Sequence, residues 1–137
     1  MKSGQRLFAI GWPFRSEVPL EHERQVVRSC HGVRQALCVK QRDAADLGEH
    51  NLGDMVRCIR LCMDCADICT TAAGVTSRLV DYDPAVLRPL LESCAAICRS
   101  CGDECERHAA MHAHCRVCAP ACRRCEQACQ ELLGALP

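Results

Sequence analysis

The stretch CRVCAPACRRCEQAC, residues 115–129, decides the fold, because its five cysteines follow one another at steps of three, four, three and four residues. Such steps keep side chains on one face of an α-helix, which turns once every 3.6 residues. Two further segments repeat the pattern, CIRLCMDCADIC at 58–69 and CAAICRSCGDEC at 94–105. We call these three runs the cysteine ladders. They predict three helices whose inward seams consist of thiols where other helices carry Leu or Val.

A fourth helix is expected before the ladders, with Val26, Cys30, Val33 and Leu37 on its inner face and Cys38 at the flank. The expected helices span residues 19–47, 52–80, 84–111 and 113–133. Because the connections between them are short, we predict an all-α, antiparallel up-down-up-down four-helix bundle with a cysteine-lined core. This bundle would occupy residues 18–137, after an irregular or loosely docked arm at 1–17. Pro120 should kink the last helix without ending it.

The composition narrows the classes of function. The chain has 137 residues, 15 cysteines and a net charge of zero, from 17 basic and 17 acidic residues. A neutral chain without basic runs does not favour binding to nucleic acid or to a membrane. The odd number of cysteines, their helical spacing and the lack of an export signal at the start favour free thiols in a reducing cytoplasm.

Counting outward from each connection predicts which thiols meet across the bundle. The contacts expected between the second and third helices are Cys58–Cys105, Cys62–Cys101, Cys65–Cys98 and Cys69–Cys94. Those expected between the third and fourth are Cys105–Cys118, Cys101–Cys122, Cys98–Cys125 and Cys94–Cys129. The first helix should bring Cys38 near Cys58 and Cys30 near Cys65. The thiols would then form four stacked layers along the bundle axis.

One end of this stack carries different side chains. Met55, His108, His112 and Cys115 all fall where the second helix begins, the third ends and the fourth begins. Thioether and imidazole hold a soft ion more weakly than thiolate does, so we expect this end to receive metal and pass it inward. His50, Met111 and His114 are expected to be solvated turn residues, and His22 and His31 to have no special role.

Soft thiols in such numbers favour Cu(I), which accepts two or three thiolates and can share them with a neighbouring ion. Four thiolates around Zn²⁺ leave a charge of −2, and the inward positions of the ladders carry no cation to balance it. Two alternatives stay open: a zinc- or multi-metal-binding regulatory protein, and a thiol redox protein with one reactive cysteine. The candidate metal ligands are Cys30, Cys38, Met55, Cys58, Cys62, Cys65, Cys69, Cys94, Cys98, Cys101, Cys105, His108, His112, Cys115, Cys118, Cys122, Cys125 and Cys129.

Over about residues 18–134 the chain resembles the cytosolic bacterial copper storage proteins, through CIRLCMDCADIC, CAAICRSCGDECERHAAMH and CRVCAPACRRCEQAC. The resemblance implies a cytoplasmic protein that is not an enzyme and that stores multiple Cu(I) ions, giving copper tolerance. It also implies a bundle that folds before metal arrives, metal access at the His/Met end, a homotetramer, and a small-molecule or protein copper donor. Pro120 and the two-thiol first helix depart from the pattern.

Overall fold

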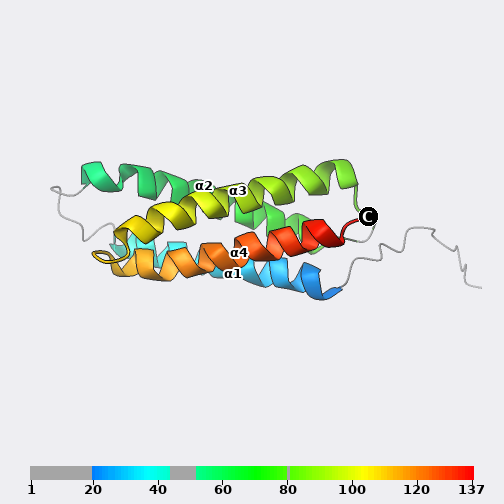
Figure 1. Ribbon diagram of the computed structural model, residues 1–137, viewed down its shortest axis with the longest axis horizontal. Helices are drawn as coiled ribbons and strands as arrows, with labels where there is room; N and C mark the ends of the chain where they lie inside the picture. The colour runs from blue at the N-terminus through cyan, green and yellow to red at the C-terminus, as the bar shows by residue number, and fades with distance from the viewer. Residues whose placement is uncertain (1–19, 44–51, 80) are drawn as a thin grey trace, which may run out of the picture.

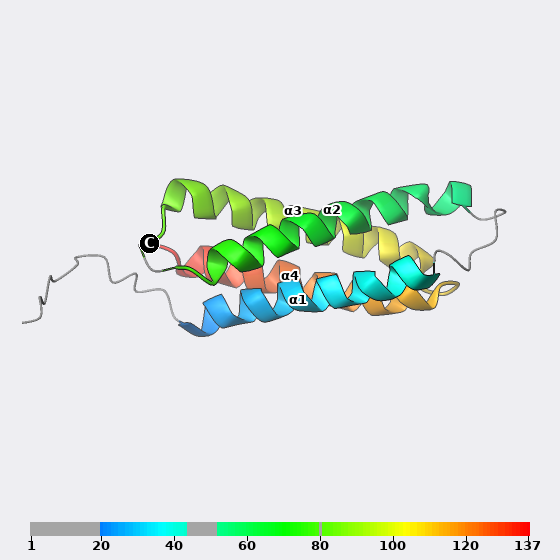
Figure 2. The same cartoon turned by 180° about the vertical axis from the view of Figure 1, so that it is seen from behind.

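Four helices make up the described part of the chain, in a computed structural model that describes residues 20–43, 52–79 and 81–137. They are α1 (Leu20–Asp43), α2 (Leu52–Thr76), α3 (Pro84–His108) and α4 (Ala113–Ala135). They run side by side in alternating directions (Figures 1 and 2). Each helix packs against its neighbours in sequence, and α1 packs against α4 to close the ring. The predicted all-α bundle is confirmed, and the predicted arm at 1–17 lies outside the described residues.

The turn between α2 and α3 is set by three residues. Asp81 takes a positive φ of 59°, a left-handed conformation that Asp tolerates better than most residues. The Asp83 side chain then caps α3 by accepting a hydrogen bond of 2.8 Å from the Ala85 N–H, and Pro84 occupies the first helical turn. This chemistry ends α2 at Thr76, four residues earlier than the predicted boundary.

The connection between α3 and α4 is shorter still. The backbone N–H groups of Met111 and His112 both bond to the carbonyl of His108, at 3.1 and 2.9 Å, and α4 starts at Ala113. The reversal therefore keeps His108 and His112 close to each other at one end of the bundle. Farther along, α4 continues through Pro120, which is exposed, so the prediction that this helix survives its proline is confirmed.

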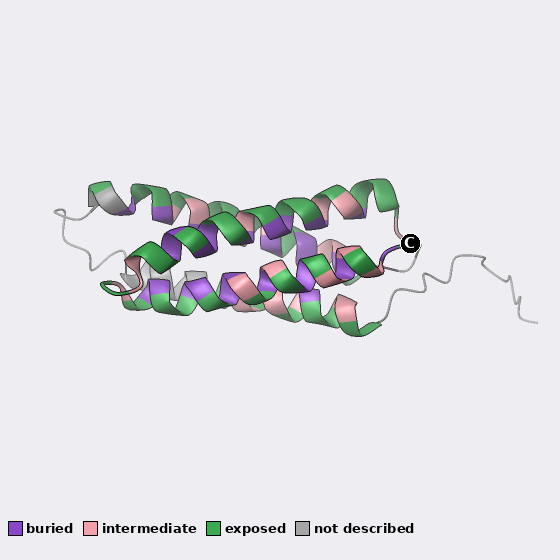
Figure 3. Cartoon of the chain, viewed as in Figure 1, coloured by how far each residue is buried: buried purple, intermediate pink, exposed green. Residues whose placement is uncertain are grey.

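The core has two parts along its length. The end where α3 begins and α4 finishes is apolar, and it buries Leu79, Leu87, Leu91, Leu132 and Leu136. Beyond it the buried face of each helix in Figure 3 is made mostly by cysteine and alanine. An apolar end of this kind can stabilise the bundle without metal, because burying a Leu side chain contributes roughly 1.5–3 kcal/mol.

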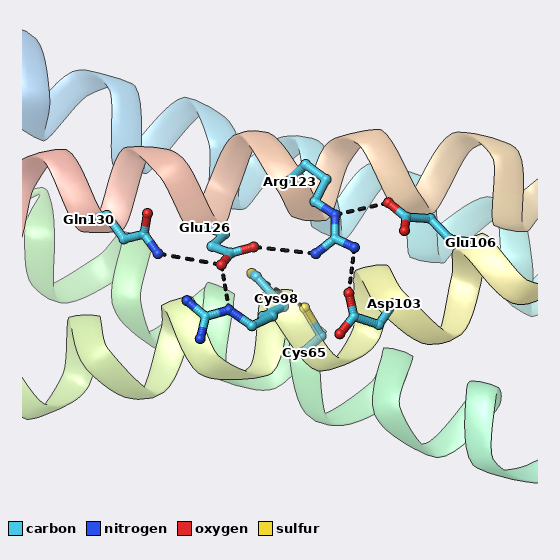
Figure 4. Close-up of polar contacts among 8 residues, drawn as sticks. Cys65, Cys98, Asp103, Glu106, Arg123, Glu126 and Gln130 are labelled. Atoms are coloured by element: carbon cyan, nitrogen blue, oxygen red, sulfur yellow. Dashed lines mark hydrogen bonds and ion pairs between the residues drawn. The ribbon is translucent and has the colours of Figure 1, made fainter.

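An ion-pair network ties the outer faces of α3 and α4 together (Figure 4). Arg123 of α4 bonds to Asp103 and Glu106 of α3, and also to Glu126 on its own helix. Arg99 of α3 bonds to Glu126 at 2.7 Å. Cys65 and Cys98, also labelled in this view, are fully buried, whereas Arg99, Asp103 and Glu106 are exposed, so these charges stay outside the core. None of the helices in the described part of the chain is long and apolar enough to span a bilayer.

Candidate metal centre

The cysteines form the inside of the bundle. Every cysteine whose side chain the structure describes is buried and outside any disulfide, which covers all fifteen except Cys38. Cys38 belongs to α1, but its side chain lies outside the described residues, and its predicted contact with Cys58 stays a prediction. The expected inner face of α1 is confirmed for Val26, Cys30 and Val33, which are all buried, whereas the side chain of Leu37 lies outside the described residues.

The predicted contacts between α2 and α3 are all present. The Sγ atoms lie 3.9 Å apart for Cys58–Cys105, 3.5 Å for Cys62–Cys101, 3.7 Å for Cys65–Cys98 and 3.8 Å for Cys69–Cys94. A metal–sulfur bond of about 2.3 Å places two sulfurs on one ion no more than about 4.6 Å apart. Each of these pairs can therefore hold an ion between two helices with little movement of the backbone.

Groups of three or four thiols, with all sulfurs within 4.8 Å of one another, follow the bundle axis. From the His/Met end inward they are Cys58/Cys105/Cys115, Cys62/Cys101/Cys105/Cys118, Cys65/Cys101/Cys122, Cys65/Cys69/Cys98 and Cys30/Cys69/Cys94/Cys125. Successive groups share a member, in turn Cys105, Cys101, Cys65 and Cys69. We call this connected set the thiol column. Because successive groups share a cysteine, the predicted layers overlap along the bundle axis. One sulfur could therefore bridge two neighbouring ions.

One thiol, Cys30, sits one step from its predicted place. Cys30 contacts Cys125 at 3.5 Å and groups with Cys69, where contact with Cys65 was expected. The observed partner on α2 lies four residues after the predicted one, which is one ladder step. The prediction counted outward from the middle of the α1–α2 connection, whereas the two helices pair about a different point. On α4, Cys118 touches Cys101 at 3.9 Å and also groups with Cys105, the expected partner.

Burial acts to raise the pKa of the column thiols, whereas hydrogen bonds from neighbouring thiols lower the pKa of some of them, such as Cys62 and Cys122. Contact with Cys122 raises the pKa of Cys98, and burial raises it further. Contact with Cys105 likewise raises the pKa of Cys101, again with a contribution from burial. A buried thiolate without a counter-ion is costly, so the neutral column packs as small apolar side chains. A metal ion that enters must displace these protons.

The His/Met end brings three imidazoles together. The ring centroids of His108 and His112 lie 6.2 Å apart, and those of His112 and His114 lie 5.4 Å apart with the rings stacked. Cys115 reaches the first group of the column, 3.9 Å from Cys58, and the buried Met55 lies one helical turn before Cys58. We call this end, defined by Met55, His108, His112, His114 and Cys115, the mouth.

With this geometry in place, the family of the chain can be decided. The sequence model of the copper storage protein family matches residues 19–134. The chain belongs to this family.

Solved relatives place other copper storage proteins on the same fold. The copper storage protein Ccsp from Streptomyces lividans, loaded with 10 copper equivalents, is 50% identical with a TM-score of 0.79, over 88% of this chain and 89% of that one. The same protein, described as cytosolic, is also known with five coppers (50% identical, TM-score 0.77, 85% and 96% covered). The Cu(I)-bound copper storage protein BsCsp3 is 27% identical, with a TM-score of 0.69 over 82% and 98% of the two chains.

A curated relative is the uncharacterized cysteine-rich protein YhjQ of Bacillus subtilis (strain 168). It is 39% identical over 75 residues, which are 55% of this chain and 64% of YhjQ. This copper storage protein therefore spans slightly less than two thirds of the length of the curated relative that it matches.

Two residues at or next to the mouth, His114 and Glu104, are buried although their burial was not predicted from the sequence. His114 was expected in solvent, but it is 3% exposed. Glu104 lies between two ladder cysteines and is 5% exposed, with ion pairs of 3.3 Å to Arg57 and 3.0 Å to Arg107. Its other oxygen lies 3.3 Å from Nε2 of His108. A carboxylate in this place orients the imidazole, as it does for many metal-binding histidines. The four-residue step from Glu104 to His108 was the available signal.

Proposed function

We propose that this copper storage protein stores and buffers many Cu(I) ions on the thiolates of a bundle that folds before metal arrives. The observation that carries the proposal is the sharing of Cys105, Cys101, Cys65 and Cys69 between successive groups of the thiol column. Bridging thiolates let each sulfur serve two ions, so a load on the order of one Cu(I) per cysteine keeps the core close to neutral. The ligands proposed are the described ladder thiols and Cys30, with the mouth residues as the first binding site.

The charge of the core favours Cu(I) over zinc. The buried polar and charged side chains of the described residues are Thr76, Glu104 and His114, so neither lysine nor arginine enters this part of the core. Several tetrathiolate zinc sites, each with a charge of −2, would lack a counter-ion there. The regulatory zinc protein therefore receives less support than the copper store. A redox enzyme would need one thiol that reacts alone, whereas most of the described cysteines lie in groups of three or four.

The cellular setting follows from the relatives and from the chemistry. We propose a cytoplasmic, non-enzymatic protein that confers copper tolerance, in agreement with the cytosolic description of the Streptomyces lividans relative. A small-molecule or protein donor would deliver the ion to the mouth. The homotetramer implied by the family resemblance stays a proposal, which sedimentation equilibrium of the apo and loaded protein would test.

Expression in a copper-sensitive bacterium tests the function. The wild-type chain should raise the copper concentration that stops growth, whereas a variant with Cys62, Cys101, Cys105 and Cys118 changed to alanine should protect much less at equal protein level. Growth in added zinc is the matched control, in which cells that express the wild-type chain and cells that express the variant should tolerate zinc equally. Protection against zinc but not copper would reject the copper store in favour of the zinc-binding alternative.

Changing His108 and His112 together to alanine should slow copper loading severalfold while sparing most of the capacity. The reason is that both imidazoles lie at the mouth, whereas the groups of the thiol column consist of cysteines alone. Stopped-flow mixing of apo protein with a chromophoric Cu(I) complex measures the rate. Met111→Ala is the control, because Met111 lies in the same turn and is exposed. Equal loading rates in all three proteins would show that the mouth histidines do not receive the ion.

A further inference from the structure

A cavity of about 280 Å³ lies on the side of the bundle, lined by residues of α1 and α2 and by Ser77. We call it the side cavity. Cys30, His31 and Arg34 of α1 line it together with Cys69, Thr70 and Gly74 of α2. It is distinct from the mouth, which is built by the start of α2, the end of α3 and the start of α4.

Cys30 and Cys69, two members of the thiol column, are among the residues that line the side cavity, and both are buried, at 1% and 0% exposed. Both belong to the group Cys30/Cys69/Cys94/Cys125, the innermost of the thiol column and the one farthest from the mouth. Their neighbours are close, with sulfur distances of 3.5 Å from Cys30 to Cys125 and 3.6 Å from Cys69 to Cys98. An ion held at the inner end of the column would otherwise have to pass every other group to leave by the mouth.

The rim of the side cavity is positively charged. Arg34 is one of the lining residues, and the guanidinium of Arg78 lies against Gly74, 3.6 Å from where a Cβ would stand. None of the described residues that line the cavity carries a carboxylate. His31 adds an imidazole that can hold a soft ion briefly. A cationic opening that lies against buried thiols suits a small molecule that combines a thiol with carboxylates.

We infer that the side cavity is a second opening of the copper store, at which a small anionic thiol exchanges Cu(I) directly with Cys30 and Cys69. The inference rests on the proposed function. In the exchange, the sulfur of the incoming thiol forms a bond to Cu(I), and the bond from Cu(I) to Sγ of Cys30 or Cys69 breaks. The proton of the incoming thiol moves to the released cysteine. Copper stays Cu(I), so the step needs neither oxidant nor reductant.

A matched pair of threonines allows the opening to be blocked. Thr70 and Thr71 are neighbours on α2, both are exposed, and each hydroxyl donates to the carbonyl four residues earlier. Thr70 lines the side cavity, whereas Thr71 is outside its lining. Copper-loaded Thr70→Trp and Thr71→Trp proteins would be mixed with mercaptosuccinate as the shuttle and bathocuproine disulfonate as the final trap. Only Thr70→Trp should lower the thiol-dependent transfer rate, by severalfold. Equal rates in the two variants would overturn the side opening.

Charge reversal supplies a second test that leaves the cavity open. Arg34→Glu should slow transfer by mercaptosuccinate about tenfold and speed transfer by the cationic thiol cysteamine, because local charge of this kind changes association rates by at least that factor. Arg60→Glu, at an exposed position on α2 outside the cavity lining, is the control and should change neither rate. The same response in both variants would mean that the thiol acts elsewhere.

Alkylation of the metal-free protein tests the opening without copper. Iodoacetate should modify Cys30 and Cys69 before Cys98 and Cys101, as mapped by peptide mass spectrometry, and Thr70→Trp should delay the first two. If Cys30 and Cys69 react no sooner than Cys98 and Cys101, the side opening is wrong.

The copper capacity of the unmodified protein separates the two proposals. A low capacity would reject the proposed function itself, whereas full capacity with equal transfer rates in the variants would reject only the side opening.

Discussion

Changing Cys62, Cys101, Cys105 and Cys118 together to alanine should lower the copper capacity by more than about four ions per chain, the number expected from one Cu(I) per thiol. The loss should exceed the contribution of this group alone, because Cys101 and Cys105 also belong to the adjoining groups of the thiol column. The remaining inner thiols should fill more slowly, since the path from the mouth is interrupted. Anaerobic titration with Cu(I) against a competing chelator measures both the capacity and the rate.

Cys129→Ala is the control for that experiment. Cys129 is buried and neighbours Cys125, Cys30 and Cys94, but it belongs to none of the groups of the column. Its removal should therefore cost no more than about one ion. If the single change abolished uptake as completely as the fourfold change, the thiols would not be acting as a graded store, and a single reactive site would explain the protein better.

Leu87→Ala should destabilise the metal-free bundle by about 2–5 kcal/mol, the usual range for removing a fully buried leucine side chain. Leu87 is 1% exposed and lies at the apolar end of the core, away from the mouth. If the bundle folds before metal binds, this end supplies much of the stability of the apo protein. Urea unfolding of the reduced apo protein, followed by circular dichroism, gives the free energy of unfolding.

The neighbouring residue gives the matched control. Val86 is 55% exposed on the same turn of α3, so Val86→Ala should change the free energy of unfolding by no more than about 0.5 kcal/mol. Comparable losses in the two variants, or a Leu87→Ala protein as stable as the wild type, would show that the apolar end does not hold the apo bundle together.

Spacing alone was enough to predict the parts of the column that depend on short connections. The α2–α3 contacts follow from steps of three and four residues on both helices and from a turn whose position is marked by Asp83 and Pro84. The closeness of His108 and His112 could be predicted as well, because the tight turn after His108 must place His112 beside it. In both cases local chemistry determines the register of the helices.

Other features depend on tertiary packing, which the neighbouring residues in the sequence do not determine. The partner of Cys30 was displaced by one ladder step because the point about which α1 and α2 pair depends on how the whole of α1 packs on α2 and α4. Burial of His114 and Glu104 depends on the side chains that surround them at the mouth, including Arg57 from α2. The side cavity likewise exists because Ala73 and Gly74 are too small to fill the space opposite α1.

The most direct test of the account is an anaerobic titration of the fully reduced protein with Cu(I), and separately with Zn²⁺, while far-ultraviolet circular dichroism is recorded. A preformed store predicts a helical spectrum before any metal is added, little change on loading, and uptake of Cu(I) on the order of the cysteine count. Only a few zinc ions should bind. Saturation at a few metal ions with zinc preferred, or a chain that becomes helical only as metal is added, would contradict it.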